Sequence, residues 1–411
     1  MDKSSGQVGV ALIGVTGYGE SHIQSILAAQ EAGVCRWVAA YDRDPQRLAQ
    51  QAGLLDEHGV KRFDDLETML TAVGDEVQLV GVPVGIPYHA ELSIRCMEAG
   101  YHVICEKPPA PTIQDLDAMI AASARTGRFC AIGFQRSWSK AAHHTHRLIC
   151  DGVLGEIRSV HIAACWKRPD TYYTRNNWAG KLRADGRWVL DGTINNPFAH
   201  QIQAALELAS TDPDRPTEPV RVRAELYRCH DITGDDTSSV AIEAANGAMI
   251  YTHLTLCTEA PSQGPIQTRV VGEKGSIEGA DSRSLTVKLN DGQTLPIEPD
   301  DVDPRLLMYR DTCRFILTGQ PPPRCPVAKT RPFVLAVDGA FESNSLPRAI
   351  DAKFLRTEPF RDSTACCLQG VDEAIAQGFQ TGKLFSELGL PWAHPSEWFE
   401  LGGYRSFDPS F

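Results

Sequence analysis

ALIGVTGYGESH, residues 11–22, joins an apolar run to a helical pattern through a turn that contains three glycines. The apolar run, VGVALIG at residues 8–14, is typical of a buried strand because it shows no polar alternation and ends in a glycine. The pattern after the turn, ESHIQSILAAQEAG at residues 20–33, places apolar residues at helical spacing and also ends in a glycine. A strand, a glycine turn and a helix in this order predict an anion-binding turn, because the N–H groups at a helix N-terminus attract negative charge.

The glycines of this turn differ in one place from the GxGxxG fingerprint of dinucleotide-binding turns. Gly14 and Gly19 have the expected spacing, but Thr16 occupies the middle position and Gly17 comes one residue late. Such a turn lets the backbone approach a diphosphate, and the alternative is a tight strand-to-helix turn without a ligand. The candidate cofactor-binding residues of the turn are Gly14, Thr16, Gly17, Tyr18 and Gly19.

Residues 7–133 alternate between apolar strand patterns and helical patterns. Fully apolar strands separated by helices predict a parallel sheet that is covered on both faces, which is the doubly wound α/β arrangement. In that arrangement, ligands bind at the carboxyl ends of the strands. The further predicted strands are 36–42, 77–83, 101–107 and 129–134, and the predicted helices are 44–53, 89–100 and 112–127.

An acidic residue follows the second predicted strand, where it could meet a ribose. Asp42 lies 23 residues after Gly19, close to the spacing of ~20 residues at which an acid holds the ribose of a dinucleotide. Its charge would bind the adenosine ribose hydroxyls and repel a 2′-phosphate, so we expect NAD as the cofactor. Its neighbour Arg43 could pair with that phosphate, which keeps NADP as an alternative. Asp42 could instead be a loop acid or a helix cap.

The second part of the chain changes to longer strands joined by tight turns. Its Asn-Gly and Asp-Gly pairs are typical of hairpins, so an antiparallel sheet is expected. Helical patterns at 197–209 and 304–318 should cover one face of this sheet, which gives an α+β arrangement. The tail predicts a helix within 363–389, followed by a coil rich in Pro and Trp. The predicted strands are 159–167, 220–227, 238–256, 268–280 and 285–297.

Charge and hydropathy exclude several classes of partner. The 40 basic and 52 acidic residues give a net charge of −12, which argues against binding to a phosphate backbone, so no nucleic-acid partner is expected. The polar start MDKSSGQ has no basic segment before a long apolar run, so we expect no secretory signal. No apolar run approaches the ~18 residues that a membrane helix needs. We therefore expect a cytoplasmic protein without a membrane partner.

The cysteine and histidine patterns predict no metal site. The twelve cysteines form no CxxC pair, and several fall in apolar patterns, as buried thiols of a reducing compartment do. Cys366 and Cys367 are too close for an ordinary disulfide. The segment HHTH places His143 and His146 on one helix face, but the segment itself contains no acid or cysteine that could complete a metal site. A solvated helix face is therefore the preferred interpretation.

A lysine stands at the end of a predicted buried strand, in the segment EKPPAPT at residues 106–112. At the carboxyl end of a parallel strand, Lys107 could hydrogen-bond a substrate hydroxyl or carbonyl beside a nicotinamide and move the proton that accompanies a hydride. Glu106 could orient the lysine or hold the cofactor, and a cis bond to Pro108 would aim the side chain. A surface ion pair between Glu106 and Lys107 is the alternative.

These features resemble the Gfo/Idh/MocA oxidoreductases, the relatives of glucose-fructose oxidoreductase and inositol dehydrogenase. The resemblance rests on the glycine turn, on EKP at the end of the strand predicted at 101–107 and on WAGKLRADGRWVLDGTINN, with NGAMIYTHLTL and VVGEKGSIEG further along the chain. It covers residues 8 to about 350 of the sequence. It implies NAD(P)-dependent oxidation or reduction of a sugar, a cyclitol or a related polyol.

The resemblance also implies the fold class. It is α/β, with an N-terminal Rossmann doubly wound parallel sheet and a C-terminal α+β domain with a large, mainly antiparallel open sheet. We expect the Rossmann dinucleotide-binding domain at 1–133, a substrate-binding and oligomerisation domain at 134–350, and a C-terminal extension at 351–411 packed on the second domain. An uncovered sheet face predicts a homodimer or homotetramer, since large exposed apolar patches are rare on monomers.

In that family the lysine of EKP, an aspartate and a histidine four residues later line the reaction site. Here the lysine is Lys107 and the aspartate is Asp191, but Asn195 stands where the histidine is expected. An asparagine can orient a hydroxyl but cannot take its proton. A helix predicted to start at Pro197 places His200 in its first turn, where it could replace the histidine or simply pack. Asp191 could instead be an acid at the helix entry.

Two further segments carry candidate residues. VPVGIPYHAE at 82–91 resembles the cofactor loop of the family, with Pro83 and His89 at matching places. The aromatic segment at 166–181 suits a sugar site, because rings stack on C–H faces and donors bind hydroxyls, while packing within its own domain is the alternative. The candidate substrate-binding residues are Arg168, Tyr172 and Trp178, with Lys107, Asp191 and Asn195.

Three functions remain compatible with these residues. The leading hypothesis is a dehydrogenase that transfers a hydride between nicotinamide and a sugar, cyclitol or polyol. The second is a lyase or glycosidase-type relative that retains NAD and oxidises its substrate only transiently. The third is a non-catalytic sensor that binds cofactor or sugar, which the missing histidine favours and the intact Lys107 and Asp191 oppose.

Overall fold

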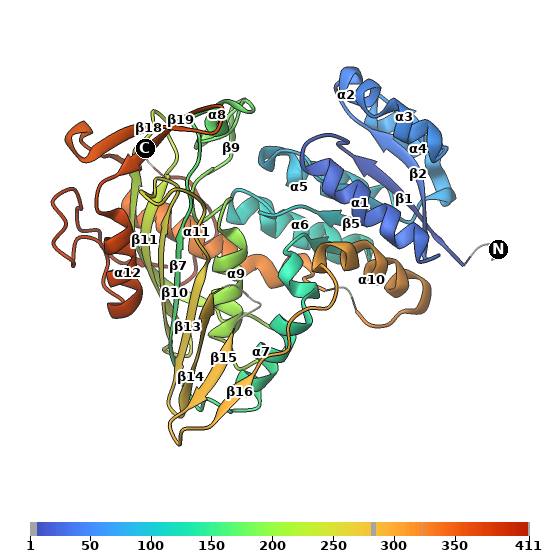
Figure 1. Ribbon diagram of the computed structural model, residues 1–411. Coiled ribbons are helices and arrows are strands. Elements are labelled where there is room, and N and C mark those ends of the chain that lie inside the picture. The colour runs from blue at the N-terminus through green and yellow to red at the C-terminus, as the bar shows by residue number, and fades with distance from the viewer. Residues whose placement is uncertain (1–5, 281–284, 323, 410–411) are drawn as a thin grey trace. The chain divides into compact units, whose positions relative to one another are not determined.

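The computed structural model describes residues 6–280, 285–322 and 324–409, and it divides the chain into two compact units (Figure 1). The Rossmann unit comprises Met1–Ala110, Asp115–Ser139 and Asp300–Thr330. The C-terminal unit comprises Pro111–Gln114, Lys140–Pro299 and Arg331–Phe411. The first five residues of the polar start lie outside the described residues.

The Rossmann unit is built on a parallel sheet of six strands in the order β3-β2-β1-β4-β5-β6. The order reverses at β1, so the first strand lies in the middle of the sheet, as expected for a doubly wound fold. The strands are short and largely apolar, and β1, β4 and β6 are buried along their whole length. The strands are β1 Val8–Ile13, β2 Cys35–Tyr41, β3 Lys61–Phe63, β4 Leu79–Val82, β5 His102–Cys105 and β6 Cys130–Ile132.

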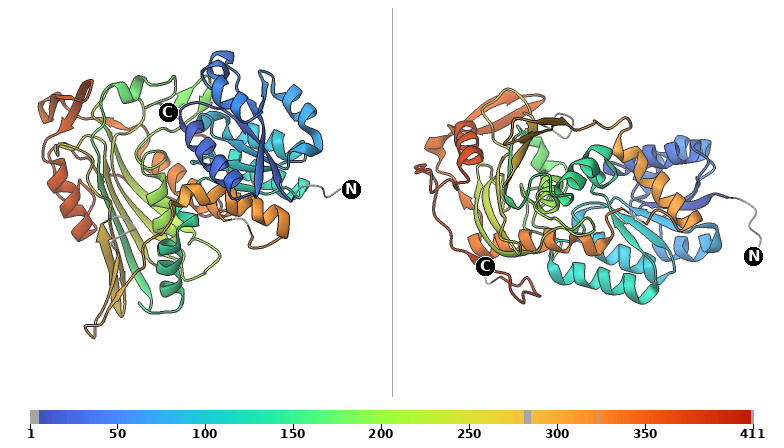
Figure 2. Two further views of the ribbon diagram at one scale, coloured as in Figure 1. Left: turned by 45° about the vertical axis from the view of Figure 1, so that its right-hand side comes forward. Right: turned by 90° about the horizontal axis from the view of Figure 1, so that it is seen from below.

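Helices lie on both faces of this sheet, with α1 and α10 on one side and α5 and α6 on the other (Figure 2). The first helix begins at Tyr18, directly after Gly17, whose positive φ of 62° favours glycine. Asp44 caps α2 and Asp65 caps α4, each by accepting a hydrogen bond from a backbone N–H group. The helices of the unit are α1 Tyr18–Glu31, α2 Pro45–Gln50, α3 Ala52–Glu57, α4 Leu66–Val73, α5 His89–Glu98, α6 Ile113–Thr126 and α10 Pro304–Thr318.

Helix α10 belongs to a different unit from the one that the sequence predicts. The pattern at 304–318 predicts the helix bounds correctly, but the helix belongs to the Rossmann unit and does not cover the second sheet. It packs against α1, where Ser25 Oγ donates a hydrogen bond to Arg305 O at 2.7 Å. Apolar periodicity predicts a helix but does not identify the sheet against which the helix packs. The sequence prediction therefore placed residues 300–330 in the second domain, whereas they belong to the Rossmann unit.

The C-terminal unit is built on a ten-stranded sheet in which most neighbours are antiparallel. Two pairs are parallel, β12 with β7 and β10 with β17. Hairpin turns join β11 to β12 and β15 to β16, as the Asn-Gly and Asp-Gly pairs predict. A further turn at Glu273 and Lys274 joins β13 to β14 within the segment 268–280, which was predicted as strand throughout. The strands are β7 Ile157–Cys165, β10 Pro219–Arg228, β11 Thr237–Ala244, β12 Met249–Thr255, β13 Gln267–Gly272, β14 Gly275–Ala280, β15 Thr286–Leu289, β16 Thr294–Pro296, β17 Arg348–Ala349 and β20 Phe399–Glu400.

Helices and two small hairpins complete this unit. The tail predicted as one helix instead forms a strand, β19, and then α12, because the apolar run STACCL pairs with β18. Helix α9 begins at Ala199 rather than at Pro197, since residues 193–198 form turns. The helices are α7 Lys140–Cys150, α8 Thr171–Thr174, α9 Ala199–Leu208, α11 Arg331–Asn344 and α12 Val371–Thr381, and the hairpins are β8 Arg183–Ala184 with β9 Arg187–Trp188 and β18 Leu355–Phe360 with β19 Ser363–Leu368.

Both faces of the large sheet carry cover over its central strands. Helices α9 and α11 lie on one face and α12 on the other (Figure 1). The residues after β17 build an apolar cluster against Tyr227, to which Ile375, Phe385 and Trp392 contribute. The uncovered face that motivated an oligomer is therefore covered over β7 and β12 by the chain's own tail. The homodimer or homotetramer remains a prediction.

Among the described residues, no helix combines the length and the apolar character that crossing a membrane requires.

Candidate active site

The glycine turn after β1 brings two stretches of backbone into close contact. A Cβ on Gly19 would lie 2.4 Å from Gly14 O, so only glycine allows this approach. Gly14 itself has a positive φ of 94°. A Cβ on Gly17 would meet no atom within 4 Å, so space remains beside the first turn of α1. Open space beside the N-terminus of a helix fits a bound diphosphate.

The acid at the end of β2 is buried and fixed beside the turn. Asp42 is only 3% exposed. Its Oδ1 accepts a hydrogen bond from Asp44 N at 3.0 Å, and its Oδ2 lies 3.4 Å from Val15 N. The Arg43 guanidinium stacks over the Tyr88 ring, 4.9 Å from its centroid. The structure therefore brings the carboxylate to the glycine turn, where a ribose acceptor is needed.

The loop after β4 approaches the same turn. Pro83 O would lie 3.4 Å from a Cβ on Gly14. His89 begins α5 and is fully buried, with Nδ1 at 2.7 Å from Pro108 O and Nε2 at 3.0 Å from Val84 O. Burial lowers the pKa of His89, which favours the neutral imidazole. A neutral ring donates through one nitrogen only, so His89 hydrogen-bonds either to Pro108 O, in the segment after Lys107, or to Val84 O, in this loop.

The lysine segment is held by a buried carboxylate. Glu106 follows β5 and is 4% exposed. Its Oε2 accepts a hydrogen bond from Lys107 N at 3.0 Å, and its Oε1 accepts one from Gln135 Nε2 at 3.1 Å. The bond between Lys107 and Pro108 is cis. Glu106 thus fixes the backbone from which the Lys107 side chain departs.

A histidine of the first helix completes this network. His22 Nε2 lies 3.1 Å from Glu106 Oε1, and His22 Nδ1 lies 2.8 Å from Tyr309 OH. Two glycines make room for the network, because a Cβ on Gly133 would lie 2.4 Å from Glu106 Oε1 and one on Gly81 would lie 1.9 Å from Tyr309 OH. Sequence reasoning missed His22, Gln135 and Tyr309. The only local signal for this network was the segment ESH, which follows the glycine turn and contains His22.

In the C-terminal unit, Asp191 is the centre of a second buried polar group. It is 3% exposed, and its Oδ2 accepts a hydrogen bond from Gly180 N at 2.6 Å. Its Oδ1 accepts one from Asn196 Nδ2 at 2.8 Å. The loop before β11 passes close by, since a Cβ on Gly234 would lie 1.9 Å from Asp191 O. The carboxylate is therefore held in one orientation.

The two asparagines after Asp191 have different partners. Asn195 Nδ2 donates to Val189 O and to Leu190 O, each at 3.1 Å. The neighbouring Asn196 is the residue whose amide reaches Asp191. Asn195 therefore uses its amide hydrogens on the backbone of its own turn, and sequence reasoning missed Asn196.

A second acid, Asp235, belongs to the loop that passes close to Asp191. Asp235 is buried, and its Oδ2 accepts the Thr193 N–H at 2.9 Å and the Thr193 hydroxyl. Burial raises the pKa of Asp235 to about 7, against the opposing effect of these hydrogen bonds. His200 lies in the first turn of α9.

The aromatic segment forms a stack of rings and guanidinium groups. The Arg168 guanidinium lies 4.8 Å from the Trp166 ring centroid and 5.1 Å from that of Tyr172. Arg175 lies 3.7 Å from the Tyr172 centroid and 5.2 Å from that of Trp178. Burial lowers the pKa of Arg168 and raises that of Tyr172. The three predicted substrate residues thus lie in one cluster of alternating cations and rings.

Two family models match the sequence of this chain. A model described as an oxidoreductase family with an NAD-binding Rossmann fold matches residues 8–134, and the GFO/IDH/MocA C-terminal domain matches residues 143–278. The chain belongs to the Gfo/Idh/MocA oxidoreductase family. The glycine turn, Asp42 and the open space beside Gly17 fit the NAD that this family binds.

Proteins similar to this chain include dehydrogenases of a glucoside and of inositol. D-glucoside 3-dehydrogenase of Escherichia coli is 34% identical over 112 residues, 27% of this chain and 31% of that protein. Inositol 2-dehydrogenase of Pseudomonas fluorescens is 28% identical over 276 residues, 66% of this chain and 72% of that protein. The match thus spans about a third of the former protein and nearly three quarters of the latter.

Solved structures share the fold. The WlbA dehydrogenase of Bordetella pertussis, in complex with NADH and UDP-GlcNAcA, aligns with a TM-score of 0.69 and 22% identity over 84% of this chain and 100% of that one. A likeness at this identity confirms the predicted combination of a Rossmann sheet and a large mixed sheet.

Proposed function

We propose that this protein is an NAD-dependent oxidoreductase that transfers a hydride between the nicotinamide and a hydroxyl-bearing carbon of a sugar, cyclitol or related polyol. The observation that carries the proposal is the lysine at the end of β5, whose backbone is fixed by the buried Glu106. Family membership and the names of the relatives support the reaction class and the class of substrate.

In this proposal the Rossmann unit binds the cofactor, whose nicotinamide supplies hydride acceptance. Gly14, Thr16, Gly17, Tyr18 and Gly19 present the helix N-terminus to the diphosphate. The Asp42 carboxylate accepts the adenosine ribose hydroxyls, and Arg43 lies beside it on the Tyr88 ring. The loop with Pro83 and His89 borders the glycine turn, and Glu106 fixes the segment beyond β5.

Lys107 acts on the substrate hydroxyl. Its amine accepts the hydroxyl proton as the hydride leaves the same carbon, and solvent then receives that proton. Glu106 is a positioning residue, since it fixes the Lys107 backbone through one oxygen and is itself fixed by His22 and Gln135 through the other.

The proposed substrate residues of the C-terminal unit provide acceptors and flat surfaces. Asp191 accepts a substrate hydroxyl, while Gly180 N–H and Asn196 keep its carboxylate in place. Arg168, Tyr172 and Trp178 offer a donor and two rings, a combination that suits the polar and C–H faces of a sugar. Asn195 supports the Asp191 turn, and His200 stays a candidate for the missing histidine.

The test is a turnover assay with purified full-length protein, NAD⁺ and a panel of D-glucosides, myo-inositol and free sugars. The proposal expects NADH to accumulate with at least one of these compounds, together with a product two hydrogens lighter. Conversion without NADH accumulation would replace the proposal with the NAD-retaining lyase. Binding of NAD⁺ and sugar without any conversion would replace it with the sensor.

A further inference from the structure

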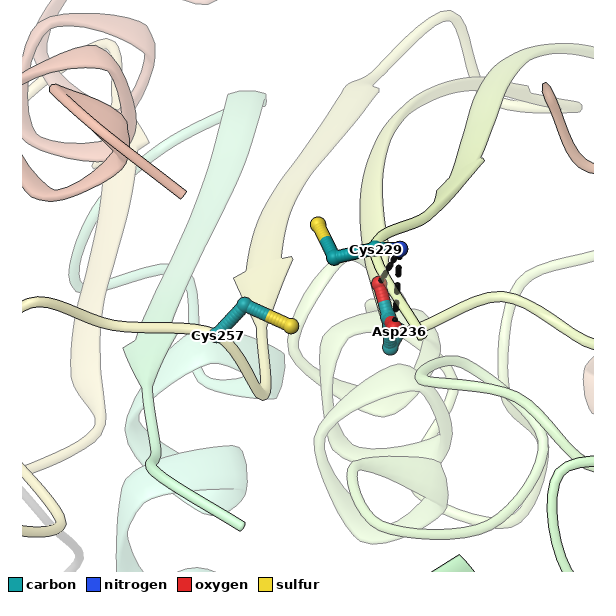
Figure 3. Close-up of side chains that lie close together, drawn as sticks. All are labelled: Cys229, Asp236 and Cys257. Carbon is teal, nitrogen blue, oxygen red and sulfur yellow. Dashed lines mark hydrogen bonds between the residues drawn. The ribbon is translucent and has the colours of Figure 1, made fainter. Parts of the chain in front are cut away.

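Three segments of the C-terminal unit bring thiol and carboxylate groups together. Cys229 follows β10, Asp236 precedes β11 and Cys257 follows β12. One ligand atom from each of the three lies within 4.8 Å of the others (Figure 3). Asp236 is fully buried and Cys257 is too, and neither cysteine forms a disulfide. These are residue types that bind soft divalent cations when grouped in this way.

An imidazole joins the same group. His230 Nδ1 lies 2.8 Å from Asp236 Oδ2 and 3.7 Å from Cys257 Sγ. His230 Nε2 lies 3.3 Å from Asp170 Oδ1. A carboxylate on the far nitrogen is the arrangement that orients the histidine ligands of metal ions. His230 Nδ1 is therefore in contact with two of the three ligand atoms, and its other ring nitrogen faces a carboxylate.

We propose that Cys229, Cys257, His230 and Asp236 form a structural zinc site. Two thiolates, an imidazole nitrogen and a carboxylate oxygen complete a tetrahedral set, and the two thiols release their protons when the ion binds. Bond lengths of about 2.0–2.3 Å place tetrahedral ligand atoms about 3.3–3.8 Å apart. The distances of 2.8 Å and 3.7 Å and the limit of 4.8 Å differ from this range by an ångström or less.

The carboxylate is already oriented for this role. Asp236 Oδ1 accepts a hydrogen bond from Cys229 N at 2.9 Å, and Oδ2 accepts one from His230 N at 3.0 Å. Backbone N–H groups thus hold both oxygens, and Oδ2 is also in contact with His230 Nδ1. A divalent ion would compensate the charge of this fully buried acid and of the two thiolates.

The site would stabilise the loop that supports Asp191. The residues between Cys229 and Asp236 include Thr233, whose N–H donates to Gly180 O at 3.0 Å, and Asp235, which accepts the Thr193 N–H. Gly180 in turn donates to Asp191. An ion at the base of this loop would therefore fix the segment that orients Asp191, and its presence does not depend on the reaction proposed above.

The primary test is the zinc content of the full-length protein purified without chelator from zinc-supplemented cells. We expect one zinc ion per chain in the wild type and at least about tenfold less in Cys257→Ala and in Cys229→Ala. The matched control is Cys366→Ser, because Cys366 Sγ lies 3.8 Å from Cys229 O but stands outside the ligand set. Wild-type protein without zinc, or equal zinc loss in the control, would overturn the proposal.

Cobalt substitution provides a second measurement, which remains informative if a cysteine variant does not fold. Wild-type protein loaded with Co²⁺ should show sulfur-to-cobalt charge transfer and the strong visible bands of a tetrahedral ion. A chelator should remove these bands and lower the melting temperature. Octahedral cobalt spectra without charge transfer, or a disulfide between Cys229 and Cys257 in the purified protein, would contradict the site.

Discussion

Glu106 Oε1 lies 3.1 Å from His22 Nε2, so one buried carboxylate connects the helix of the glycine turn with the segment after β5 that carries Lys107. Because an ionised carboxylate only accepts hydrogen bonds, His22 donates through Nε2 and accepts the Tyr309 hydroxyl through Nδ1. The proposed cofactor turn and the proposed reactive lysine are therefore parts of one polar network.

Glu106→Gln should weaken both stability and turnover. An amide cannot accept through both of its terminal atoms, so one donor among His22, Gln135 and the Lys107 N–H loses its partner. A lost buried partner costs about 1–3 kcal/mol of unfolding free energy. Misplacement of Lys107 should reduce kcat at least about tenfold. Thermal denaturation and steady-state kinetics measure the two effects.

The exposed Glu57→Gln is the control for that variant, since it removes the same charge from the surface of α3. Unchanged kcat and melting temperature in Glu106→Gln would show that the network does not position the lysine.

NAD⁺ should stabilise the protein more than NADP⁺ does. The buried Asp42 carboxylate would accept ribose hydroxyls and repel a 2′-phosphate. Thermal-shift titrations measure the increase in melting temperature that each cofactor causes. Asp42→Ala should reduce the difference between the increase with NAD⁺ and the increase with NADP⁺. A larger shift with NADP⁺ than with NAD⁺ in the wild type would reject this assignment and favour Arg43 as a phosphate partner.

In the zinc-free protein, Asp235→Asn should stabilise the protein more at alkaline pH than at acidic pH. Burial raises the pKa of Asp235 to about 7 from an ordinary 3.8. The folded state therefore retains the proton more strongly, so the carboxyl contributes stability below about pH 4 that is lost as the pH rises towards 7. The loss is at most about 4 kcal/mol, and a neutral amide avoids it.

Melting temperatures at about pH 5 and about pH 8.5 check this, with the exposed Asp151→Asn as the control. A difference between variant and wild type that is equal at the two pH values would show that Asp235 does not titrate in this range.

His200→Asn should leave the pH–rate profile of the enzyme in place. His200 lies nine residues after Asp191 and in the first turn of α9, and we assign the proton transfer to Lys107 instead. The measurement is kcat/KM against pH for the wild type and the variant. Loss of activity together with loss of the basic-limb ionisation would identify His200 as the base and refute the assignment to Lys107.

Local patterns predicted the Rossmann sheet and its turn because each of their signals is short-range. The apolar strand, the glycines and the first helix are neighbours in sequence, and Lys107 follows its strand directly. The partner of Glu106 could not be predicted in this way. His22 is separated from it by 84 residues and from Tyr309 by 287, so only the folded chain brings these side chains together.

The C-terminal unit shows the same limit. Its Asn-Gly and Asp-Gly pairs predict hairpins. The prediction that α10 belongs to this unit was wrong, because a helical pattern does not identify the sheet or helix against which it packs. The amide that bonds to Asp191 was also not predicted, since Asn196 Nδ2 donates to this carboxylate while Asn195 donates to backbone carbonyls. The thiol cluster was not predicted because Cys257 follows a different strand from Cys229 and Asp236, and only the folded sheet brings the two thiols together.

The most direct test of the central claim is turnover and NAD⁺ affinity measured side by side in Lys107→Met, with the exposed Lys61→Met as the control. The account predicts that Lys107→Met lowers kcat by about a hundredfold or more, because the group that takes the proton is gone. It also predicts that the Kd for NAD⁺ stays within a few-fold of the wild-type value. A variant that retains substantial turnover, with NAD⁺ still bound, would contradict the assignment of Lys107 and the mechanism built on it.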